Sequence, residues 1–189
     1  MENVMIVDWD AHHGNGTQDI FWADPDVLFF DIHRASPFYP GTGALEDIGA
    51  GLGEGTTVNV PVPAGTGDAG YLKVFREILE PAADWFKPDL ILVSAGFDAH
   101  WMDLALNVSY EGFGAMTGAI QAIAQRHCEG RLAFILEGGY SLESLPRGVH
   151  AVLNVLAGAD PIEPGICGFK EVEAAAQFHR DAFIPPEGE

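Results

Sequence analysis

The sequence has few cysteines, few basic residues and no long apolar run. Its two cysteines, Cys128 and Cys167, cannot build a disulfide framework, and neither belongs to a CxxC pair. Nine Lys and Arg against 28 Asp and Glu give a formal net charge of −19 at pH 7, which disfavours direct binding to nucleic acid or to an anionic membrane. No apolar run approaches the ~20 residues of a membrane-spanning helix. Since no signal-peptide pattern is evident either, we expect a cytoplasmic protein.

What the sequence does contain is an alternation of strand and helix patterns. The 189 residues are 48% hydrophobic, which is typical of a folded domain. Five short runs are rich in apolar residues, and most of them are apolar at consecutive positions, as in strands buried on both faces of a parallel sheet. These runs are Val4–Val7, Val27–Phe30, Thr57–Val62, Leu90–Val93 and Leu132–Leu136. Helical spacing predicts helices over 71–79, 109–123 and 149–156, so we expect an α/β fold with a mainly parallel sheet and helices on both faces.

The sequence predicts one domain followed by a C-terminal tail. We expect residues 1–158 to form the α/β domain and residues 159–189 to form a C-terminal tail. The tail mixes Pro and Gly with one short helical candidate, Phe169–Phe178, and a peripheral position is expected for it.

Polar residues directly follow three of the predicted strands, which is where open α/β sheets bind ligands. After the first strand, Asp8, Asp10 and His12 point to one side of an extended segment, because residues two apart share a face. A carboxylate and an imidazole at this spacing form a compact pair of metal ligands. The alternative is that these acids cap the helix that follows.

Asp98 follows the run Leu90–Val93 and extends this cluster. Together with Asp10 and His12 it completes a set of two carboxylates and one imidazole, which suits a divalent cation and leaves a coordination position open. Taken alone, Asp98 is a loop acid or a helix cap.

Tyr140 follows the last strand after two glycines, Gly138 and Gly139. The glycines let the backbone approach a ligand closely, and the neutral phenol can donate a hydrogen bond to a developing oxyanion. The alternative is an ordinary surface tyrosine.

The segment Gly65–Gly70 matches the G-x-G-x-x-G pattern of dinucleotide-binding proteins. Pro61 and Pro63 interrupt the preceding strand, and Asp68 would repel a pyrophosphate. A nucleotide-binding α/β protein is therefore a remote alternative.

Taken together, five motifs resemble the zinc-dependent histone deacetylase superfamily, especially its class II-like bacterial and archaeal members and the acetylpolyamine amidohydrolases. The motifs cover roughly residues 4–158. They are the runs 8–17 (DWDAHHGNGT), 39–43 (YPGTG), 58–61 (VNVP), 94–100 (SAGFDAH) and 136–140 (LEGGY). The resemblance implies an arginase-like fold, hydrolysis of an acetyl amide, and an acetylated lysine peptide or polyamine as the substrate.

The resemblance also implies roles for particular residues. Asp10, His12 and Asp98 match the zinc ligands, with iron(II) as an alternative metal. Tyr140 matches the donor that polarises the acetyl carbonyl, and Tyr39 matches an aromatic wall of the acyl-lysine tunnel. Gly138 and Gly139 line the substrate site in this interpretation.

A potassium site is implied near the zinc strand. Its ligands would be the main-chain carbonyls of Asp10, His12 and Ile32 and the side chain of Asp8. Asp31 stands where many relatives have a small hydroxyl residue, which weakens the match.

Relatives also carry a pair of adjacent histidines, a general base and acid, well upstream of the zinc strand, and this chain has no counterpart of that region. Asp8 and Asn15 match the residues that orient the pair. A smaller departure is Asp103-Leu104-Ala105, where relatives have Pro after the acid.

Three expectations follow from the lack of the upstream region. The isolated chain should have little activity, because general acid–base catalysis contributes a factor of about 10² to 10⁴. A non-catalytic metal-binding or scaffold domain that needs a partner is the alternative. The first strand should also present an exposed hydrophobic edge, which favours self-association or a partner that supplies the absent region.

Overall fold

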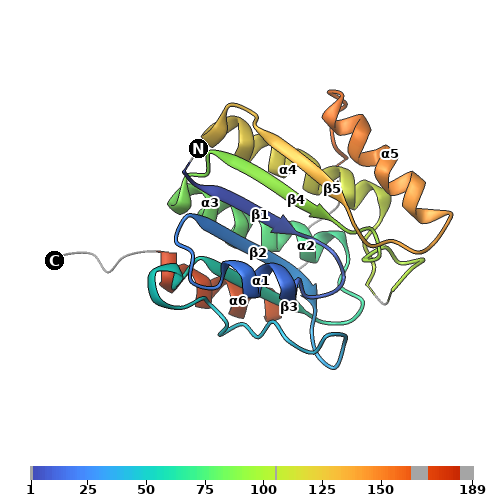
Figure 1. Cartoon of the computed structure of the whole chain (residues 1–189). Coiled ribbons are helices and arrows are strands. Elements are labelled where there is room, and N and C mark those ends of the chain that lie inside the picture. Colours follow the sequence, from blue (N-terminus) through green and yellow to red (C-terminus); the bar gives the residue numbers. More distant parts are fainter. Residues whose placement is uncertain (1, 105, 163–169, 184–189) are drawn as a thin grey trace.

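The computed structural model describes residues 2–104, 106–162 and 170–183. Within them, five strands form one sheet in the order β3-β2-β1-β4-β5, and every pairing is parallel (Figure 1). The strands are β1 (Val4–Asp8), β2 (Val27–Arg34), β3 (Thr57–Val62), β4 (Leu90–Ala95) and β5 (Leu132–Leu136). Each expected strand is present, and the α/β fold is confirmed.

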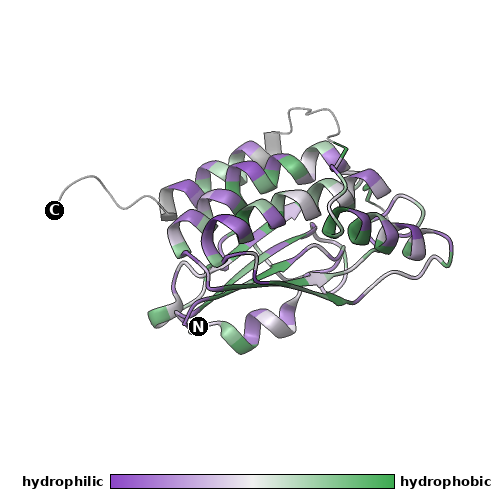
Figure 2. Ribbon diagram, turned by 90° about the horizontal axis from the view of Figure 1, so that it is seen from above, coloured by the Kyte–Doolittle hydropathy of each residue, from purple (hydrophilic) through white to green (hydrophobic). Residues whose placement is uncertain are grey.

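The helices cover the two faces of the sheet unequally (Figure 2). α1 (Asn15–Phe21) lies against β2 on one face, whereas α2 (Asp68–Val74), α3 (Glu80–Phe86) and α4 (Tyr110–Cys128) lie on the other. α5 (Ser144–Leu156) packs on α4. Ser109 caps α4, because its hydroxyl oxygen accepts a hydrogen bond from the Gly112 N–H at 3.1 Å.

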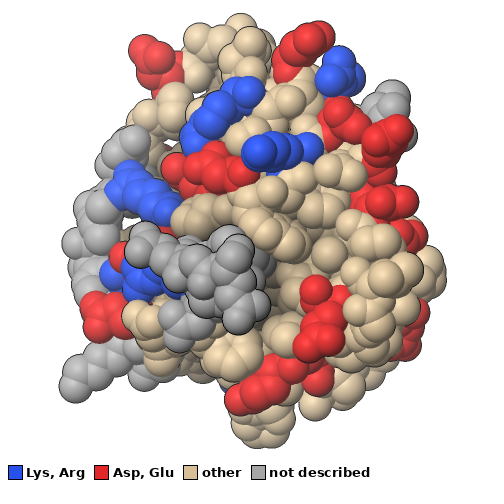
Figure 3. All heavy atoms as spheres, turned by 90° about the vertical axis from the view of Figure 1, so that its left-hand side faces the viewer, with Lys and Arg blue, Asp and Glu red and all other residues tan. Residues whose placement is uncertain are grey.

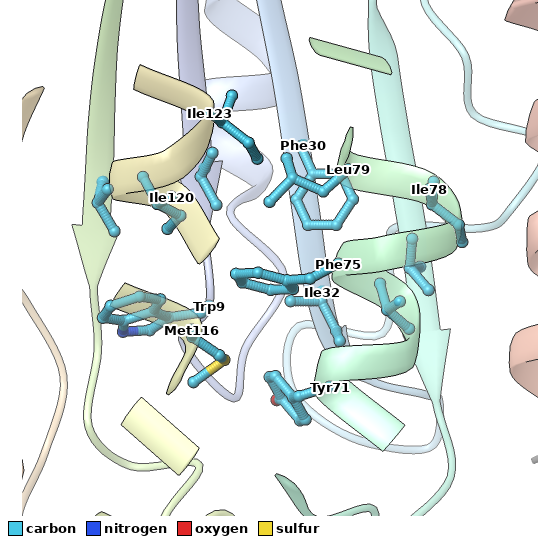
Figure 4. Packing of buried hydrophobic residues seen from close by; sticks show 14 of the residues in the cluster. Trp9, Phe30, Ile32, Tyr71, Phe75, Ile78, Leu79, Met116, Ile120 and Ile123 are labelled. Carbon is cyan, nitrogen blue, oxygen red and sulfur yellow. The ribbon is translucent and has the colours of Figure 1, made fainter. Parts of the chain in front are cut away.

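The main core lies between the sheet and the helices α2 to α4 (Figure 4). Trp9, Phe30, Phe75 and Ile120 are fully buried there. The Trp9 ring contacts three further aromatic rings, those of Phe97, Phe113 and Phe134, at centroid distances of 6.4, 6.0 and 5.6 Å. Trp9 therefore anchors the residues that follow β1 against the core.

The helix predicted over residues 71–79 continues past Pro81, contrary to the sequence prediction. A π-helical turn at Phe75–Leu79 joins α2 to α3, and Pro81 lies in the first turn of α3. Proline lacks an N–H and crowds the carbonyl four residues earlier, and a wider turn accommodates both effects. The chain thus continues as a helix through a proline that normally interrupts one.

The C-terminal helix α6 (Lys170–Phe183) is longer than predicted and is not peripheral. It contacts β3, α2 and α3, and Ala175, Ala176 and His179 are buried. The His179 Nε2–H donates to the main-chain carbonyl of Asn59 on β3 at 2.9 Å. Phe169, where the helix was predicted to begin, lies outside the described residues.

The prediction that the first strand has an exposed edge is wrong. β1 lies in the centre of the sheet between β2 and β4, and its residues from Met5 to Asp8 are buried. The strand at the open edge is β5, in which Ile135 and Leu136 are 46% and 60% exposed.

Some of the few basic side chains gather where the strands begin, and there they lie among acidic ones (Figure 3). Arg126 in the last turn of α4 pairs with Asp84 at 2.9 Å, and Arg131 before β5 pairs with Glu129 at 3.3 Å. Among the described residues, no helix has the length and hydropathy needed to span a bilayer.

Candidate metal centre

The predicted metal ligands come together at the carboxyl ends of two neighbouring strands. Asp10 and His12 follow β1, and Asp98 follows β4, which pairs directly with β1. One ligand atom from each of the three side chains lies within 4.8 Å of the other two. The strand pairing therefore brings together residues that are almost 90 positions apart.

The His12 Nδ1 atom lies between the two carboxylates. It is 2.9 Å from Asp10 Oδ1 and 3.0 Å from Asp98 Oδ2. A tetrahedral site with bond lengths of about 2.0–2.1 Å places its ligand atoms about 3.3 Å apart. The three atoms are thus close to the spacing that a zinc-sized cation needs.

The Asp98 carboxylate has a buried oxygen atom without a hydrogen bond. The residue is fully buried, and its Oδ1 accepts the Ala11 N–H at 2.8 Å. Its Oδ2 is buried but makes no hydrogen bond of acceptable geometry, although His12 Nδ1 is near. A buried carboxylate oxygen without a hydrogen bond is costly, and a bound cation would satisfy it. The residues present therefore fit a divalent metal.

Charge repulsion between the acids of this site also favours a bound cation. Burial and the neighbouring Asp10 carboxylate raise the pKa of Asp98 to about 6. Burial, and next the charge of Asp31, raise the pKa of Asp8 well above its ordinary value. A cation would lower the cost of keeping these acids ionised.

Two glycines make room for the carboxylates. A Cβ atom at Gly138 would lie 2.9 Å from Asp98 Oδ2 and closer still to Asp10 Oδ2. A Cβ atom at Gly96 would also collide with the Asp10 carboxylate. Glycine is needed at both positions because the acids occupy the space that any side chain would take.

The loop after β5 carries Tyr140, and Asp103 holds it. The Asp103 carboxylate accepts the N–H groups of Tyr140 and Ser141, each at 2.8 Å. The Tyr140 side chain is 69% exposed. Partial burial, and next the charges of Asp98 and Asp10, raise the pKa of its phenol, so the phenol stays protonated at neutral pH. Ala105, two positions after Asp103, lies outside the described residues.

Aromatic rings border the other side of the site. The Phe38 ring stacks on His12 at 4.8 Å, and Tyr39, which is 78% exposed, meets the same imidazole edge-on at 6.2 Å. An open cavity of about 360 Å³ adjoins them. It is lined by Asp8, Asp10, His12, His13, Gly14, Tyr39, Glu137, Gly138 and Tyr140.

Comparison with known proteins identifies this arrangement. The family model for the histone deacetylase domain matches residues 1–156. The chain belongs to the histone deacetylase family. It is 49% identical over 162 residues to a probable deacetylase of Archaeoglobus fulgidus, a match that covers 84% of this chain and 45% of that protein. It is 41% identical to the histone deacetylase-like amidohydrolase of Pseudomonas aeruginosa, covering 84% of this chain and 42% of that protein.

A solved structure agrees with this assignment. The crystal structure of the HDA15 HD domain matches with a TM-score of 0.87 at 39% identity, covering 96% of this chain and 51% of that one. The chain thus spans about half the length of these three proteins, 45%, 42% and 51% respectively.

The residues predicted to bind potassium lie beside the metal centre. Asp8 is buried next to Asp31 across the β1–β2 pairing, and Ile32 follows on β2. The Asp31 carboxylate already has two partners, since it lies 2.6 Å from His33 Nδ1 and accepts the Gly14 N–H at 2.7 Å. Asn15 is exposed at the start of α1 and does not line the cavity. The roles of these residues stay predictions.

Sequence reasoning missed a buried hydrogen-bond network behind the site. The imidazole of His13 lies 2.8 Å from Thr42 Oγ1 and 3.0 Å from Gln18 Oε1, and the latter also accepts Asn59 Nδ2–H at 2.7 Å. Because an amide oxygen only accepts, His13 carries its proton on Nε2, and its Nδ1 accepts the Thr42 hydroxyl. The network ties the loop of Tyr39 to the metal strand. No local pattern pointed to it, because its members are distant in sequence.

Two other motifs lie outside the metal centre. His100 is fully buried, its ring stacks on Tyr110 at 4.4 Å, and its Nδ1 accepts the Met102 N–H. In the glycine motif Gly65–Gly70, the Asp68 carboxylate accepts the Ser109 N–H at 2.7 Å. That loop therefore binds the start of α4 and does not offer a phosphate cradle.

Proposed function

We propose that this chain provides the metal-binding half of a deacetylase catalytic centre. Its substrate would be the acetyl amide of a lysine peptide or of a polyamine. Asp10, His12 and Asp98 would hold zinc, with iron(II) as the substitute. The observation that carries the proposal is the buried Asp98 Oδ2, which lacks a hydrogen bond and lies 3.0 Å from His12 Nδ1.

Each side chain has a distinct role in this proposal. The zinc would supply Lewis-acid chemistry, by acidifying water and polarising the acetyl carbonyl. The protonated phenol of Tyr140 would donate a hydrogen bond to the oxygen of that carbonyl as charge develops on it. Tyr39, Gly138 and Gly139 would border the acyl chain.

Neither histidine that lines the cavity is free to act as a general base. Among the lining residues, His12 lies between the two carboxylates, and His13 is held by Thr42 and Gln18. Asp8 and Asn15 would orient a histidine pair delivered by another segment of polypeptide. We therefore propose that the chain alone is slow by a factor of about 10² to 10⁴.

A non-catalytic metal-binding domain is the second candidate. The high exposure of Tyr39 and Tyr140 favours it, because an open cavity lets water reach the metal and leaves the substrate without an enclosing wall.

Zinc titration tests the metal site. We expect one zinc per chain for the natural sequence, and a loss of at least tenfold in affinity for Asp98→Asn, which removes a charged ligand without changing its shape. Asp84→Asn, an exposed acid that pairs with Arg126, is the matched control and should bind zinc normally. Equal zinc affinity in all three proteins would refute the assigned ligands.

A hydrolysis assay separates the two candidates. The chain is assayed alone and after refolding with the region that precedes the match in the A. fulgidus deacetylase, using acetyl-lysine peptide and acetylated spermidine. Hydrolysis that appears only with the added region supports the catalytic proposal. A chain that binds zinc but stays inactive in both conditions is the non-catalytic domain.

A further inference from the structure

A short turn joins the candidate metal ligand Asp98 to the acid Asp103. The N–H of Leu104 donates to the main-chain carbonyl of Asp98 at 3.0 Å. The N–H of Asp103 donates to the carbonyl of His100 at 2.9 Å. These bonds close the turn 98–104 on itself, so Asp103 stands at a fixed place relative to Asp98. A proline at position 104, which the resembled relatives carry, has no N–H and could not make the bond to Asp98.

The Asp103 carboxylate holds the loop after β5 by a single atom. Its Oδ2 accepts the N–H groups of both Tyr140 and Ser141, each at 2.8 Å. Hydrogen bonds to a carboxylate are about twice as strong as bonds between neutral groups. Because two consecutive main-chain N–H groups point at one oxygen, the direction of the chain at Tyr140 is set as well as its position.

The residues before Tyr140 are attached to the same turn. The N–H of Phe97 donates to the carbonyl of Gly138 at 2.7 Å. Gly139 lies between the two attachments with a φ of +133°, and a Cβ there would lie 3.1 Å from the Cβ of Phe97. The main chain is thus held on both sides of Gly139, which leaves chiefly the side-chain torsions of Tyr140 free.

We infer that Asp103 is a positioning residue for the oxyanion donor, because it holds the main chain of Tyr140 at a fixed place beside Asp98. This inference rests on the proposed function, in which the Tyr140 phenol donates to the acetyl carbonyl. The Tyr140 side chain is 69% exposed, so packing does little to fix it and the main-chain attachment carries that task. A displacement of about 1 Å between reacting groups can cost about 10²-fold in rate.

The attachment also links the loop to metal binding. Gly138 packs against the ligands, since a Cβ on it would lie 2.9 Å from Asp98 Oδ2 and 2.4 Å from Asp10 Oδ2. A cation that fixes Asp98 therefore also fixes the loop of Tyr140. By thermodynamic linkage, a loop that is held raises the affinity for the cation by the same factor, and we expect about tenfold.

Hydrogen exchange of the full chain without metal, followed by NMR, tests the attachment. In Asp103→Leu, which removes both acceptor oxygens, protection of the Tyr140 and Ser141 amides should fall at least tenfold while protection across β4 stays unchanged. Asp103→Asn keeps an amide oxygen that can accept both N–H groups, so its protection should stay within about threefold of the natural protein. Asp84→Leu, at an exposed acid that pairs with Arg126, is the control and should change neither amide.

Zinc binding and catalysis give two further readouts. Zinc should raise the protection of the Tyr140 amide about tenfold in the natural protein, and Asp103→Leu should bind zinc more weakly by the same factor. In the enzyme refolded with the A. fulgidus region, Asp103→Leu should lower kcat about 10²-fold and leave KM within about threefold, because the phenol acts on the developing oxyanion. Asp103→Asn should recover most of this loss.

Natural protection of the two amides in folded Asp103→Leu overturns the inference, and so does a natural kcat. An Asp103→Asn protein as impaired as Asp103→Leu overturns it as well, because the effect would then come from the charge of the acid. If Asp103→Leu does not fold, Asp103→Ala takes its place, and unfolding of both marks a structural role that refutes positioning. A natural chain that binds no zinc refutes the proposed function, whereas exchange without metal still decides whether Asp103 holds the loop.

Discussion

Replacing Gly138 by alanine is expected to displace the metal ligands while leaving the sheet folded. The added Cβ would lie 2.9 Å from Asp98 Oδ2, whereas ordinary contact begins near 3.4 Å. Asp98 must then move by about 0.5 Å, and Asp10, which is closer, by more. Binding sites lose function when the ligating side chains are displaced from their productive positions by about this distance.

The magnitude follows from the chemistry of metal sites. Disturbing the groups that hold ligands in place lowers metal affinity by about 10- to 100-fold. This corresponds to about 1.4–2.8 kcal/mol of binding free energy. We expect this loss for Gly138→Ala in a zinc competition assay with a chromophoric chelator. Thermal unfolding, followed by circular dichroism, checks that the variant is folded.

Gly114→Ala is the matched control. A Cβ there meets Val155 Cγ2 at 3.5 Å, which is ordinary contact. Alanine in the middle of α4 should stabilise the fold by about 0.5–1 kcal/mol and leave zinc binding unchanged. Natural zinc affinity in a folded Gly138→Ala protein would refute the close approach that we describe between this glycine and the acids.

Three further predictions concern other parts of the molecule. Tyr140→Phe should keep zinc affinity within about twofold, because the phenol is not a metal ligand, but should abolish hydrolysis in the complemented enzyme. Burial lowers the pKa of His179, so the folded state prefers the neutral ring. The contribution of His179 to the free energy of unfolding should therefore be fully present above the ordinary pKa of about 6.5 and be lost as the pH drops below it, as measured by the difference between the natural protein and His179→Gln in urea titrations. Phe113→Ala should cost about 3–5 kcal/mol in the same urea assay, because the ring is fully buried against Trp9 and Phe97.

Controls for these predictions come from the same chain. Loss of zinc in Tyr140→Phe would contradict the role given to the phenol. His179→Gln should lack this contribution, and an equal dependence on pH below 6.5 in the two proteins would show that the His179 ring does not cause it. Trp85→Ala removes a ring that is 42% exposed and should cost less than Phe113→Ala. Equal costs would contradict the described core.

Local sequence patterns were sufficient for the strands and for the grouping of the candidate metal ligands, but not for α1, α3 or the full length of α6. The runs Thr57–Val62 and Leu132–Leu136 coincide with β3 and β5, and the Ser109 cap is as expected. Asp10, His12 and Asp98 were predictable together because each directly follows a buried strand. Phe38 was missed, since a ring that stacks on His12 across a loop leaves no periodic pattern.

The amino-acid sequence by itself determined which segments are strands and which side chains stand at their carboxyl ends, because apolar runs and turn residues act locally. Only the tertiary structure decided the order of the strands. Runs that are buried on both faces look alike in sequence, so nothing local distinguishes central β1 from the open β5. The pairing of strands that are distant in the chain places β3 and β5 at the two edges of the sheet. The docking of α6 on β3 covers one of these edges, whereas β5 lies at the open one.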